Sequence, residues 1–363
     1  MPAIKNAAVL LIVLACCVPL LAQANSVSTK AAPKTTSPER FLISPPTTPM
    51  VVHARFTLQD LNEITEGTET FEFRGVMTLT WQDPRQAFDP AVIGANEKVY
   101  QGAYQVNEVS TGWFPQVMLV NESGLYQTSA TTLRILPDGT STLIETINAV
   151  AESEVDMSRF PFDRHRLKAV FEVLGFDKNE VALQVDPDIS NTSRTARVPQ
   201  WLITGISTTV EDHAAPYAGK SGFSSAMVVG VEVRRLPFYA IRLVVFPLMV
   251  IVLLSFSVFW MDTSSLGDRL SVSFIGVLTA VAYLLVTSDQ LPRISYVTLM
   301  HGFVNLSFIM MCATVVINLI VGTLDKRGQV ERGNRIDQRC RWIFPLSYIV
   351  LLLLMIAVAL LFF

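Results

Sequence analysis

The chain has 363 residues, a formal net charge of −3 and a mean hydropathy of +0.41, and half of its residues are hydrophobic. This composition is too apolar for an ordinary soluble protein of this length. The exported part has no strongly basic block, so nucleic acid is not expected as a partner. The apolar residues gather at the N-terminus and, more heavily, after Pro237, so a polar region lies between an export signal and a membrane domain.

Residues 1–24 have the features of a secretory signal peptide. Lys5 precedes an apolar stretch at 7–21, and the small-residue cleavage site Ala22-Gln23-Ala24 follows it. An uncleaved membrane helix is the alternative, but the stretch is short for that role. Residues 25–50 are rich in Pro, Ser and Thr and show no periodicity, which predicts a disordered linker.

From residue 51 to about residue 235, hydrophobic and polar residues alternate. The residues that share one face of segment 70–81 are Phe71, Phe73, Met77, Leu79 and Trp81. The alternation recurs at 167–173, 181–185 and 229–233, with turn residues such as Pro137-Asp138-Gly139 and Asp186-Pro187-Asp188 between the runs. Short half-buried strands without a helical pattern predict an all-β, immunoglobulin-like sandwich over residues 51–235.

The cysteines place a limit on the chemistry of this exported region. Cys16 and Cys17 belong to the signal, and Cys312 and Cys340 lie in or beside the later apolar segments. The sandwich therefore has neither a disulfide framework nor a cysteine-based metal site. Nucleophile elbows, paired metal-binding histidines and phosphate loops are also missing from the sequence, so we predict no enzyme activity, no cofactor and no metal.

Residues 236–363 predict an all-α membrane domain. Four apolar segments, each long enough to cross a hydrocarbon core of about 30 Å, occupy 238–260, 268–287, 294–322 and 342–363. The connection 324–341 is rich in Lys and Arg, which indicates a cytoplasmic location. An exported N-terminus followed by four spans places the same connection inside, so the two signals agree on a multi-pass protein of the plasma (inner) membrane.

The second apolar segment differs from the others because it carries polar residues in a pattern. One helical stripe, with spacings of four and three, contains Ser271, Ile275, Leu278, Ala282, Leu285 and Asp289. Around a central axis this stripe would form a hydroxyl ring, an apolar constriction and an outer carboxylate ring, and Asp268 would add an inner acidic ring that favours cations. A helix that faces lipid or packs in a bundle, with hydroxyls bonded to its own backbone, explains the pattern equally well.

Two sets of motifs carry a family resemblance. Residues 156–163, Asp-Met-Ser-Arg-Phe-Pro-Phe-Asp, resemble the signature loop of the Cys-loop receptors, the pentameric ligand-gated ion channels. Leu167 and Ser153 stand where disulfide-bearing members have cysteines, which points to the prokaryotic-type branch. The second set is most similar to the amine-gated bacterial channel of that family; its motifs are Ser257-Val258-Phe259-Trp260, Asp268-Arg269-Leu270, Leu291-Pro292-Arg293 and Gln338-Arg339-Cys340-Arg341.

The resemblance, which covers about residues 51–354, implies a homopentamer with the second helix lining its pore. It implies that an agonist binds between subunits in the outer domain, and that this domain then acts on the helices. The residues expected to couple them are Asp163, Arg235, Pro292 and Arg293. An Asp163–Arg235 pair would be a bistable contact at that boundary.

The agonist site of such receptors is a box of aromatic rings that attracts cationic ligands. The ring candidates are Trp113, Phe176, Tyr217 and Phe223, of which the last two flank a Gly-containing capping loop. Trp81 and Trp201 are expected in the core, and Trp113 fits either place. Leu174, Val76 and Glu211 depart from the amine-gated relative at its site positions, so Glu145 or Glu211 would have to supply the negative charge.

Proton gating is the competing hypothesis for the trigger. Histidine side chains in general titrate near neutral pH, and His165, next to Asp163, is the best placed of the exported ones. A solvated surface histidine is the alternative. The prediction is thus a cation-preferring channel in the lipid bilayer, opened by a small-molecule agonist or by protons. A non-conducting membrane receptor or sensor with the same architecture is the alternative function.

Overall fold

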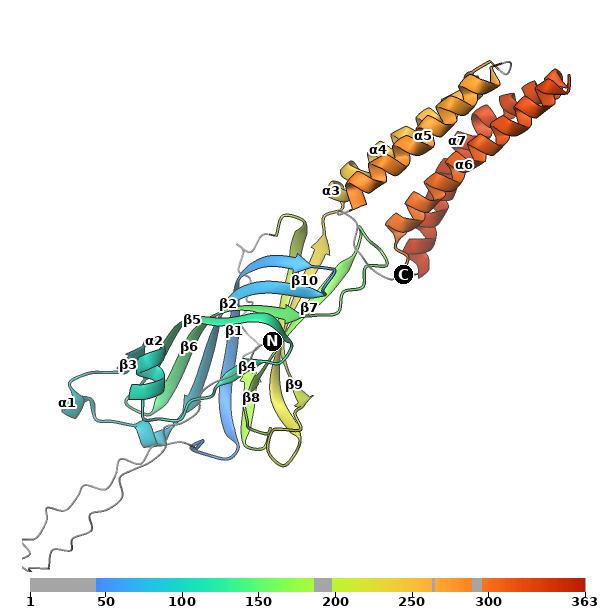
Figure 1. Cartoon of the computed structure of the whole chain (residues 1–363). Helices are drawn as coiled ribbons and strands as arrows, with labels where there is room; N and C mark the ends of the chain where they lie inside the picture. Colours follow the sequence, from blue (N-terminus) through green and yellow to red (C-terminus); the bar gives the residue numbers. More distant parts are fainter. Residues whose placement is uncertain (1–43, 186–197, 263–264, 289–295, 363) are drawn as a thin grey trace, which may run out of the picture. The chain divides into compact units, whose positions relative to one another are not determined.

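The structure is a computed structural model that describes residues 44–185, 198–262, 265–288 and 296–362 (Figure 1). Several predictions fall on other residues and so lie outside the described ranges. They are the signal peptide, most of the linker, the turn Asp186-Pro187-Asp188, and the side chains of Asp289, Pro292 and Arg293.

The predicted β-sandwich is confirmed. Within the described residues, a six-stranded sheet has the order β3-β5-β6-β2-β1-β8 and a four-stranded sheet has the order β4-β7-β10-β9. Neighbouring strands are antiparallel, except that β1 and β8 are parallel. The strands are β1 (Met50–Thr65), β2 (Thr70–Gln82), β3 (Lys98–Gln101), β4 (Val117–Leu119), β5 (Glu122–Ile135), β6 (Thr140–Glu152), β7 (Arg164–Val173), β8 (Val181–Val185), β9 (Trp201–Ala214) and β10 (Phe223–Arg235).

The core lies between the two sheets and is built from the alternating residues of each strand. On β2 the predicted inward face is buried, and its glycine, Gly75, leaves room for a ring from β1. A Cβ at Gly75 would come within 2.2 Å of Phe56 Cζ. The Phe56 ring in turn stacks on Phe171 of β7, with centroids 5.4 Å apart. This aromatic contact fixes which face of β7 points outward.

The prediction of a sandwich without helices was wrong in one stretch. Short helices interrupt the strands between β2 and β4: η1 (Pro84–Gln86), α1 (Pro90–Ile93), α2 (Gly102–Tyr104) and η2 (Gln105–Val109). The first two begin where an aspartate precedes a proline. The Asp89 carboxylate accepts a hydrogen bond from the Ala91 N–H, and Pro90 occupies the first helical position, where its missing N–H is not needed.

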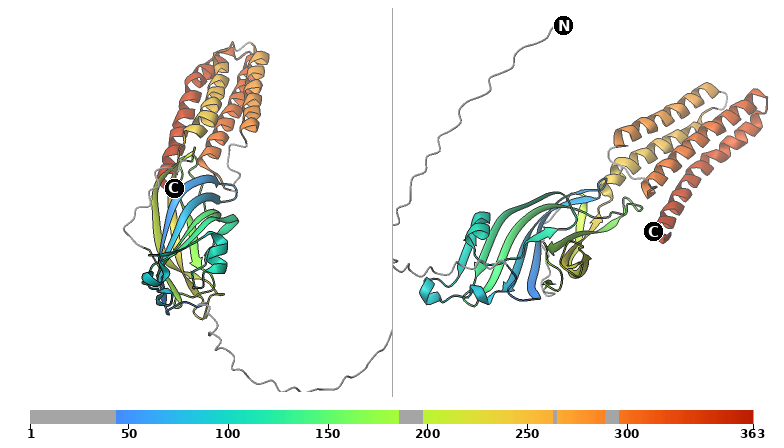
Figure 2. Two further views of the ribbon diagram at one scale, coloured as in Figure 1. Left: turned by 90° about the vertical axis from the view of Figure 1, so that its left-hand side faces the viewer. Right: turned by 60° about the horizontal axis from the view of Figure 1, so that its bottom comes forward.

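The membrane domain has four helices long and apolar enough to span a bilayer, as predicted, counted over the described residues. They run side by side in Figure 2. The first is built from α3 (Phe238–Ala240), η3 (Ile241–Val245), α4 (Phe246–Ser255) and η4 (Phe256–Trp260). The others are α5 (Leu266–Thr287), α6 (Leu299–Lys326) and α7 (Val330–Phe362).

The connection predicted at 324–341 is mostly helical instead. Helix α6 runs on to Lys326 and α7 already begins at Val330, so only a short turn separates them. The charged residues there do not stop the helix because several of them pair within it or against its neighbours. Arg335 and Glu331 form a pair one turn apart, with Nη2 and Oε2 at 3.6 Å.

The first helix is irregular because of a proline. Pro247 has no N–H, so the carbonyl of Leu243, four residues before it, has no donor along an α-helical ladder. A π-helical turn over Ile241–Val245 precedes this point. The Tyr283 hydroxyl of α5 donates a hydrogen bond to the Leu243 carbonyl. The defect in the first helix thus becomes a contact with the second.

Candidate functional site

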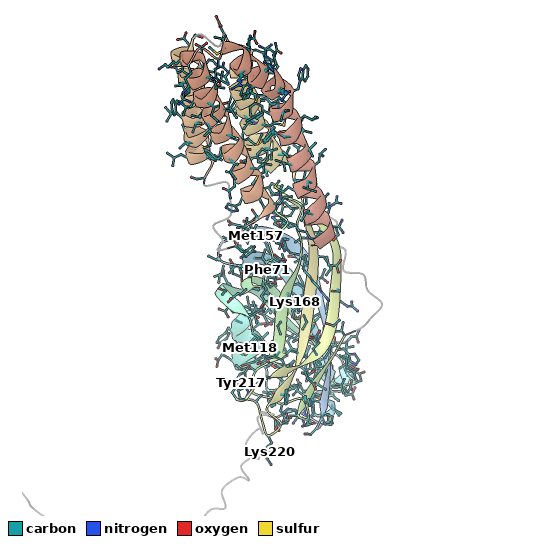
Figure 3. The ribbon with its side chains drawn as sticks, turned by 90° about the vertical axis from the view of Figure 1, so that its right-hand side faces the viewer. Phe71, Met118, Met157, Lys168, Tyr217 and Lys220 are labelled. Atoms are coloured by element: carbon teal, nitrogen blue, oxygen red, sulfur yellow. The ribbon has the colours of Figure 1, made fainter. Side chains whose placement is uncertain are left out.

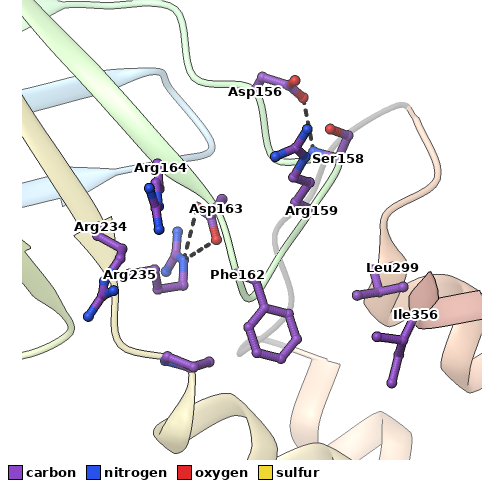
Figure 4. A pocket seen from close by; sticks show the side chains of 11 residues that line it. Asp156, Ser158, Arg159, Phe162, Asp163, Arg164, Arg234, Arg235, Leu299 and Ile356 are labelled. Atoms are coloured by element: carbon purple, nitrogen blue, oxygen red, sulfur yellow. Dashed lines mark hydrogen bonds and ion pairs between the residues drawn. The ribbon is translucent and has the colours of Figure 1, made fainter. Parts of the chain in front are cut away.

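The strongest polar cluster of the sandwich surrounds Arg235, the last residue of β10. Its Nε lies 2.9 Å from Asp163 Oδ1 (Figure 4). Its Nη2 lies 2.8 Å from Glu66 Oε1 at the β1–β2 turn. The guanidinium also lies over the Trp201 ring, 4.0 Å from its centroid. Both Arg235 and Asp163 are buried, at 4% and 1% exposed. The two residues expected to pair from the resemblance are therefore in direct contact.

His165 completes this cluster. It lies on β7, two residues after Asp163, and its Nε2 lies 2.5 Å from Asp163 Oδ2. It is buried, so the alternative of a solvated surface histidine was wrong; Trp201 covers it, with ring centroids 5.4 Å apart. Burial acts to raise the pKa of the Asp163 carboxyl, but the His165 hydrogen bond and the Arg235 charge outweigh it and hold that pKa below its ordinary value.

The loop that carries the signature motif also contacts the start of the third membrane helix. The Tyr296 hydroxyl accepts a hydrogen bond from the Met157 N–H at 2.8 Å. The Leu299 N–H donates to the Ser158 carbonyl at 3.1 Å. The loop from Met157 to Asp163 thus has polar contacts both to β10, the strand that enters the first helix, and to the residues that enter the third.

The aromatic candidates for the agonist box do not form one cluster. Trp113 is 6% exposed and packs edge-on against both Trp81 and Phe176, so in this chain it is a core residue. Trp81 and Trp201 are buried, as expected. Tyr217 and Phe223 are 55% and 45% exposed at the two sides of the β9–β10 loop. These two rings remain accessible for a ligand.

The predicted acidic candidates are also separate from each other. Glu211 is exposed on β9 and accepts a hydrogen bond from Thr209 Oγ1 at 3.2 Å. Glu145 lies on β6 in the other sheet, where burial raises the pKa of its carboxyl. Leu174, the residue expected from the resemblance to replace the site carboxylate, is 49% exposed just after β7. Of the two glutamates, Glu211 lies in the sheet whose β9–β10 loop carries Tyr217.

A carboxylate that the sequence did not single out lies beneath the β9–β10 loop. Glu172 of β7 is fully buried and accepts hydrogen bonds from the Tyr217 hydroxyl and, at 2.5 Å, from the Ser224 hydroxyl. The Ser224 hydroxyl bonds to Glu172 Oε2, and His213 Nδ1 lies 3.3 Å from the same oxygen. The hydrogen bond to Glu172 raises the pKa of Tyr217 to about 12, so this hydroxyl stays a donor at physiological pH.

A second missed carboxylate, Asp177, holds the tip of the same loop. Its Oδ2 accepts hydrogen bonds from the backbone N–H groups of Lys220 and Ser221, at 3.0 and 3.1 Å. The Ser221 bond, with those from Asn179, Lys220 and Glu180, lowers the pKa of Asp177. The loop, which Figure 3 marks at Tyr217 and Lys220, is thus attached at two points to the end of β7 and the turn after it.

Lys178 occupies space that a cationic ligand would use. Its ammonium lies 5.6 Å above the centre of the Phe223 ring and 2.5 Å from an Asp212 carboxylate oxygen. An internal cation therefore already lies over one of the two accessible rings. With this internal cation and the exposed Leu174, the site differs from an aromatic box in which a receptor carboxylate binds a cationic agonist.

The stripe predicted on the second helix lies on the outer face of the single subunit. Ile275, Leu278 and Leu285 of α5 are 61%, 68% and 75% exposed, and Ser271 and Ala282 are exposed too. The opposite face of α5 packs against the other helices through Arg269, Ser273, Ala280 and Thr287. Four hydroxyls of α5 bond to carbonyls of their own helix: Ser271, Ser273, Thr279 and Thr287.

Arg269 and Asp268 point to different surroundings although they are adjacent. Arg269 is 1% exposed; its Nη2 lies 2.5 Å from Asp337 Oδ1 of α7 and 2.9 Å from Asn318 Oδ1 of α6. Asp268 is exposed. The sequence alone did not reveal that Arg269 is buried while Asp268 is exposed. Its partners, Asp337 and Asn318, are far away in the chain and come close only in the folded structure.

Sandwich, signature loop and four apolar helices together define a membrane receptor of the ligand-gated channel class. The model of the neurotransmitter-gated ion-channel ligand binding domain matches residues 39–237, and that of the neurotransmitter-gated ion-channel transmembrane region matches residues 244–332. The chain belongs to the neurotransmitter-gated ion-channel family. Members of this family are pentameric membrane channels rather than enzymes, and this chain is of its prokaryotic type.

Individual relatives include channels with different triggers. A proton-gated ion channel of Gloeobacter violaceus is 25% identical over 326 residues, which cover 89% of this chain and 87% of the relative. A gamma-aminobutyric acid receptor subunit gamma-4 of Gallus gallus is 28% identical over 73% of this chain. An acetylcholine receptor subunit beta of Rattus norvegicus is 24% identical over 75%. The chain spans 58% and 55% of the length of these two animal subunits.

Removing the Asp163 carboxylate is expected to destabilise the protein and to flatten its response to acid. In Asp163→Asn the buried Arg235 guanidinium loses one of its two carboxylate partners and keeps Glu66, which costs up to about 3–5 kcal/mol. The pKa of Asp163 is lowered from 3.8 in the folded chain, so its contribution is complete above that pH and is lost as pH falls through the lowered value. Thermal unfolding of the detergent-solubilised protein between neutral pH and pH about 3 measures both effects.

The matched control is Asp60→Asn, at an exposed position of β1. It should leave the melting temperature and its acid dependence close to those of the wild type. Equal pH profiles for wild type and Asp163→Asn would contradict a folded-state role for the Asp163 charge.

Tyr217→Phe is expected to loosen the β9–β10 loop. Glu172 stays buried but loses one donor, and a hydrogen bond to a charged group contributes about 1.5–3 kcal/mol. Amide hydrogen exchange over residues 215–223 should therefore accelerate by about tenfold or more. Tyr104→Phe, whose ring is 74% exposed on α2, is the control and should exchange as the wild type does. Unchanged exchange in Tyr217→Phe would show that Asp177 alone holds the loop.

Proposed function

We propose that this chain forms a homopentameric, cation-preferring channel that opens when a small ligand or a change in pH is sensed by its β-sandwich domain. The observation that supports this most directly is the exposed stripe on α5. Apolar residues as large as Ile275, Leu278 and Leu285 lie together on the exposed face of α5, opposite the buried face that packs on the other helices. Five such faces around an axis would form an apolar constriction that closes to ions by dewetting.

Burial of Arg269 supports the preference for cations. If Asp268 and Arg269 both faced the pore, their charges would largely cancel at its inner mouth. The Arg269 guanidinium is instead directed toward Asp337 and Asn318, and Asp268 stays exposed. Five exposed carboxylates without compensating guanidinium groups would raise the local concentration of cations.

The trigger is proposed to act through β7 and β10. Near one end of this strand pair, Glu172 and Ser224 meet Tyr217 of the β9–β10 loop; at the other end, Asp163 and Arg235 meet next to the membrane helices. Ligand contact with Tyr217 or Phe223 would change the hydrogen bonds of Glu172. Protons would act on the buried His165–Asp163–Arg235 cluster, where a charge change has few solvent molecules to compensate it. Pro292 and Arg293 are proposed to receive the movement.

Electrophysiology of the purified protein in lipid bilayers tests the proposal. Current is recorded under a sodium gradient while pH is stepped and while amines, and then carboxylates, are applied. We expect stimulus-dependent current that reverses near the sodium equilibrium potential. Silence from protein shown to be pentameric would favour the alternative of a non-conducting receptor, and reversal near the chloride potential would overturn the cation preference.

Two substitutions on α5 are expected to separate gating from selectivity. Leu278→Ser should wet the constriction, so the channel should open at a weaker stimulus or without one, with its reversal potential unchanged. Asp268→Asn should move the reversal potential toward zero under the same gradient while the stimulus dependence persists. Ser288→Ala, an exposed hydroxyl beyond the constriction, is the control. Wild-type currents in Leu278→Ser would place the gate elsewhere.

A further inference from the structure

Two arginines that the proposed channel mechanism does not use lie directly opposite each other on the sandwich. Arg164 of β7 pairs in register with Arg234 of β10, and both side chains are exposed on the outward face of the four-stranded sheet. Like charges in directly opposed positions destabilise a sheet. Among the described residues, none of the carboxylates forms an ion pair with either guanidinium.

The neighbouring residues increase the positive charge rather than neutralise it. Arg164, Arg166 and Arg234 line a shallow pocket of about 470 Å³ together with a single exposed carboxylate, Glu232. That carboxylate lies over β9, since its Oε2 is 3.2 Å from where a Cβ of Gly205 would be. His165, which also lines the pocket, is buried and bonded to Asp163. Three guanidinium groups therefore face the pocket against one carboxylate.

Arg166 is held differently from the other two arginines. Its Nη2 donates to Ser207 Oγ at 3.0 Å, and its side chain covers Gly230, where an added Cβ would lie 2.7 Å from Arg166 Nε. Within the part of the chain that the structure describes, no side-chain hydrogen bond or ion pair holds Arg164 or Arg234 in this way. Both also line the pocket next to Asp163 and Arg235 (Figure 4). This leaves a pair of planar donors in adjacent positions, the arrangement that binds phosphate oxygens.

Covalent connection fixes how far this pair can be from the bilayer. Arg234 precedes Phe238, the first residue of the first spanning helix, by four residues, and an extended chain covers at most about 3.6 Å per residue. The Arg234 backbone thus lies within about 14 Å of the start of the span, and Arg164 is its direct neighbour across the strand pair. From there, long side chains are within reach of the headgroup layer. Exposed apolar residues follow the buried Arg235: Leu236 is 42%, Phe238 70% and Tyr239 38% exposed.

We propose that Arg164 and Arg234 bind the phosphate of an anionic phospholipid in the outer leaflet, beside the entry of the chain into the membrane. The lipid phosphate offsets the repulsion between the two guanidinium groups, and its acyl chains meet the exposed apolar residues that follow. A free phosphate ion would satisfy the charge but would gain nothing from Leu236 and Phe238. This site is independent of the agonist site and of the pore, and it goes beyond the proposed channel function.

The test compares lipid binding to the full-length protein and to R164Q/R234Q by native mass spectrometry in detergent, with phosphatidylglycerol and phosphatidylcholine as probes. Each arginine near an anionic headgroup contributes about fivefold in affinity, so the preference for phosphatidylglycerol should fall by roughly 25-fold in the double variant. R164K/R234K keeps the charge and should retain much of the preference. R74Q/R134Q, which removes two positive charges from exposed positions of β2 and β5, is the matched control and should retain all of it.

Three results would overturn the proposal. They are an unchanged lipid preference in R164Q/R234Q, an equal loss in R74Q/R134Q, and displacement of phosphatidylglycerol by inorganic phosphate at the same concentration. The last result would identify a free anion as the ligand. If the double variant does not assemble, the single substitutions R164Q and R234Q replace it, each with an expected loss of about fivefold.

Discussion

The burial of the Arg235 guanidinium is the constraint around which the sandwich is organised next to the membrane. A guanidinium in a nonpolar environment is unfavourable unless it is paired and its donors are satisfied. Arg235 meets that requirement with groups from separate parts of the chain: Asp163 after the signature loop, Glu66 at the β1–β2 turn, and the ring of Trp201 at the start of β9. Any movement of one of these segments changes the surroundings of a buried charge.

The same strand pair carries the polar cluster at its other end. From Ala226 opposite Glu172 to Arg234 opposite Arg164, the β7–β10 ladder covers nine residues in unbroken antiparallel register. At about 3.4 Å per residue, the two buried carboxylates Glu172 and Asp163 are separated by about 30 Å of one strand. The ladder is closely packed, with Phe171 against Phe56 on its inner face. Such an element transmits displacement rather than absorbing it, because packed cores resist continuous deformation.

The sequence predicted the architecture because its patterns are long and periodic. Alternation in β2, β7 and β10 and the length of four apolar segments fixed the sandwich and the spans, and the family motif pointed to the Asp163–Arg235 contact. Glu172 was missed because alternation with Phe171 and Val173 predicts an outward, solvated side chain. The β9–β10 loop covers it instead, and only tertiary structure places Tyr217 there. The helical extension of α7 was missed because charge was taken to mark a loop, whereas Asp337 is buried against Arg269.

The hydrogen bond between Tyr283 and the Leu243 carbonyl has a genetic consequence. Pro247 supplies no N–H to this carbonyl, so the proline on the first helix and the tyrosine on α5 act on the same acceptor. Any other residue at position 247 would supply an N–H that competes with the tyrosine, and the effect would be felt on α5 without a change in its own sequence. Substitutions at positions 247 and 283 will therefore be non-additive, and each position constrains which residues evolution can accept at the other.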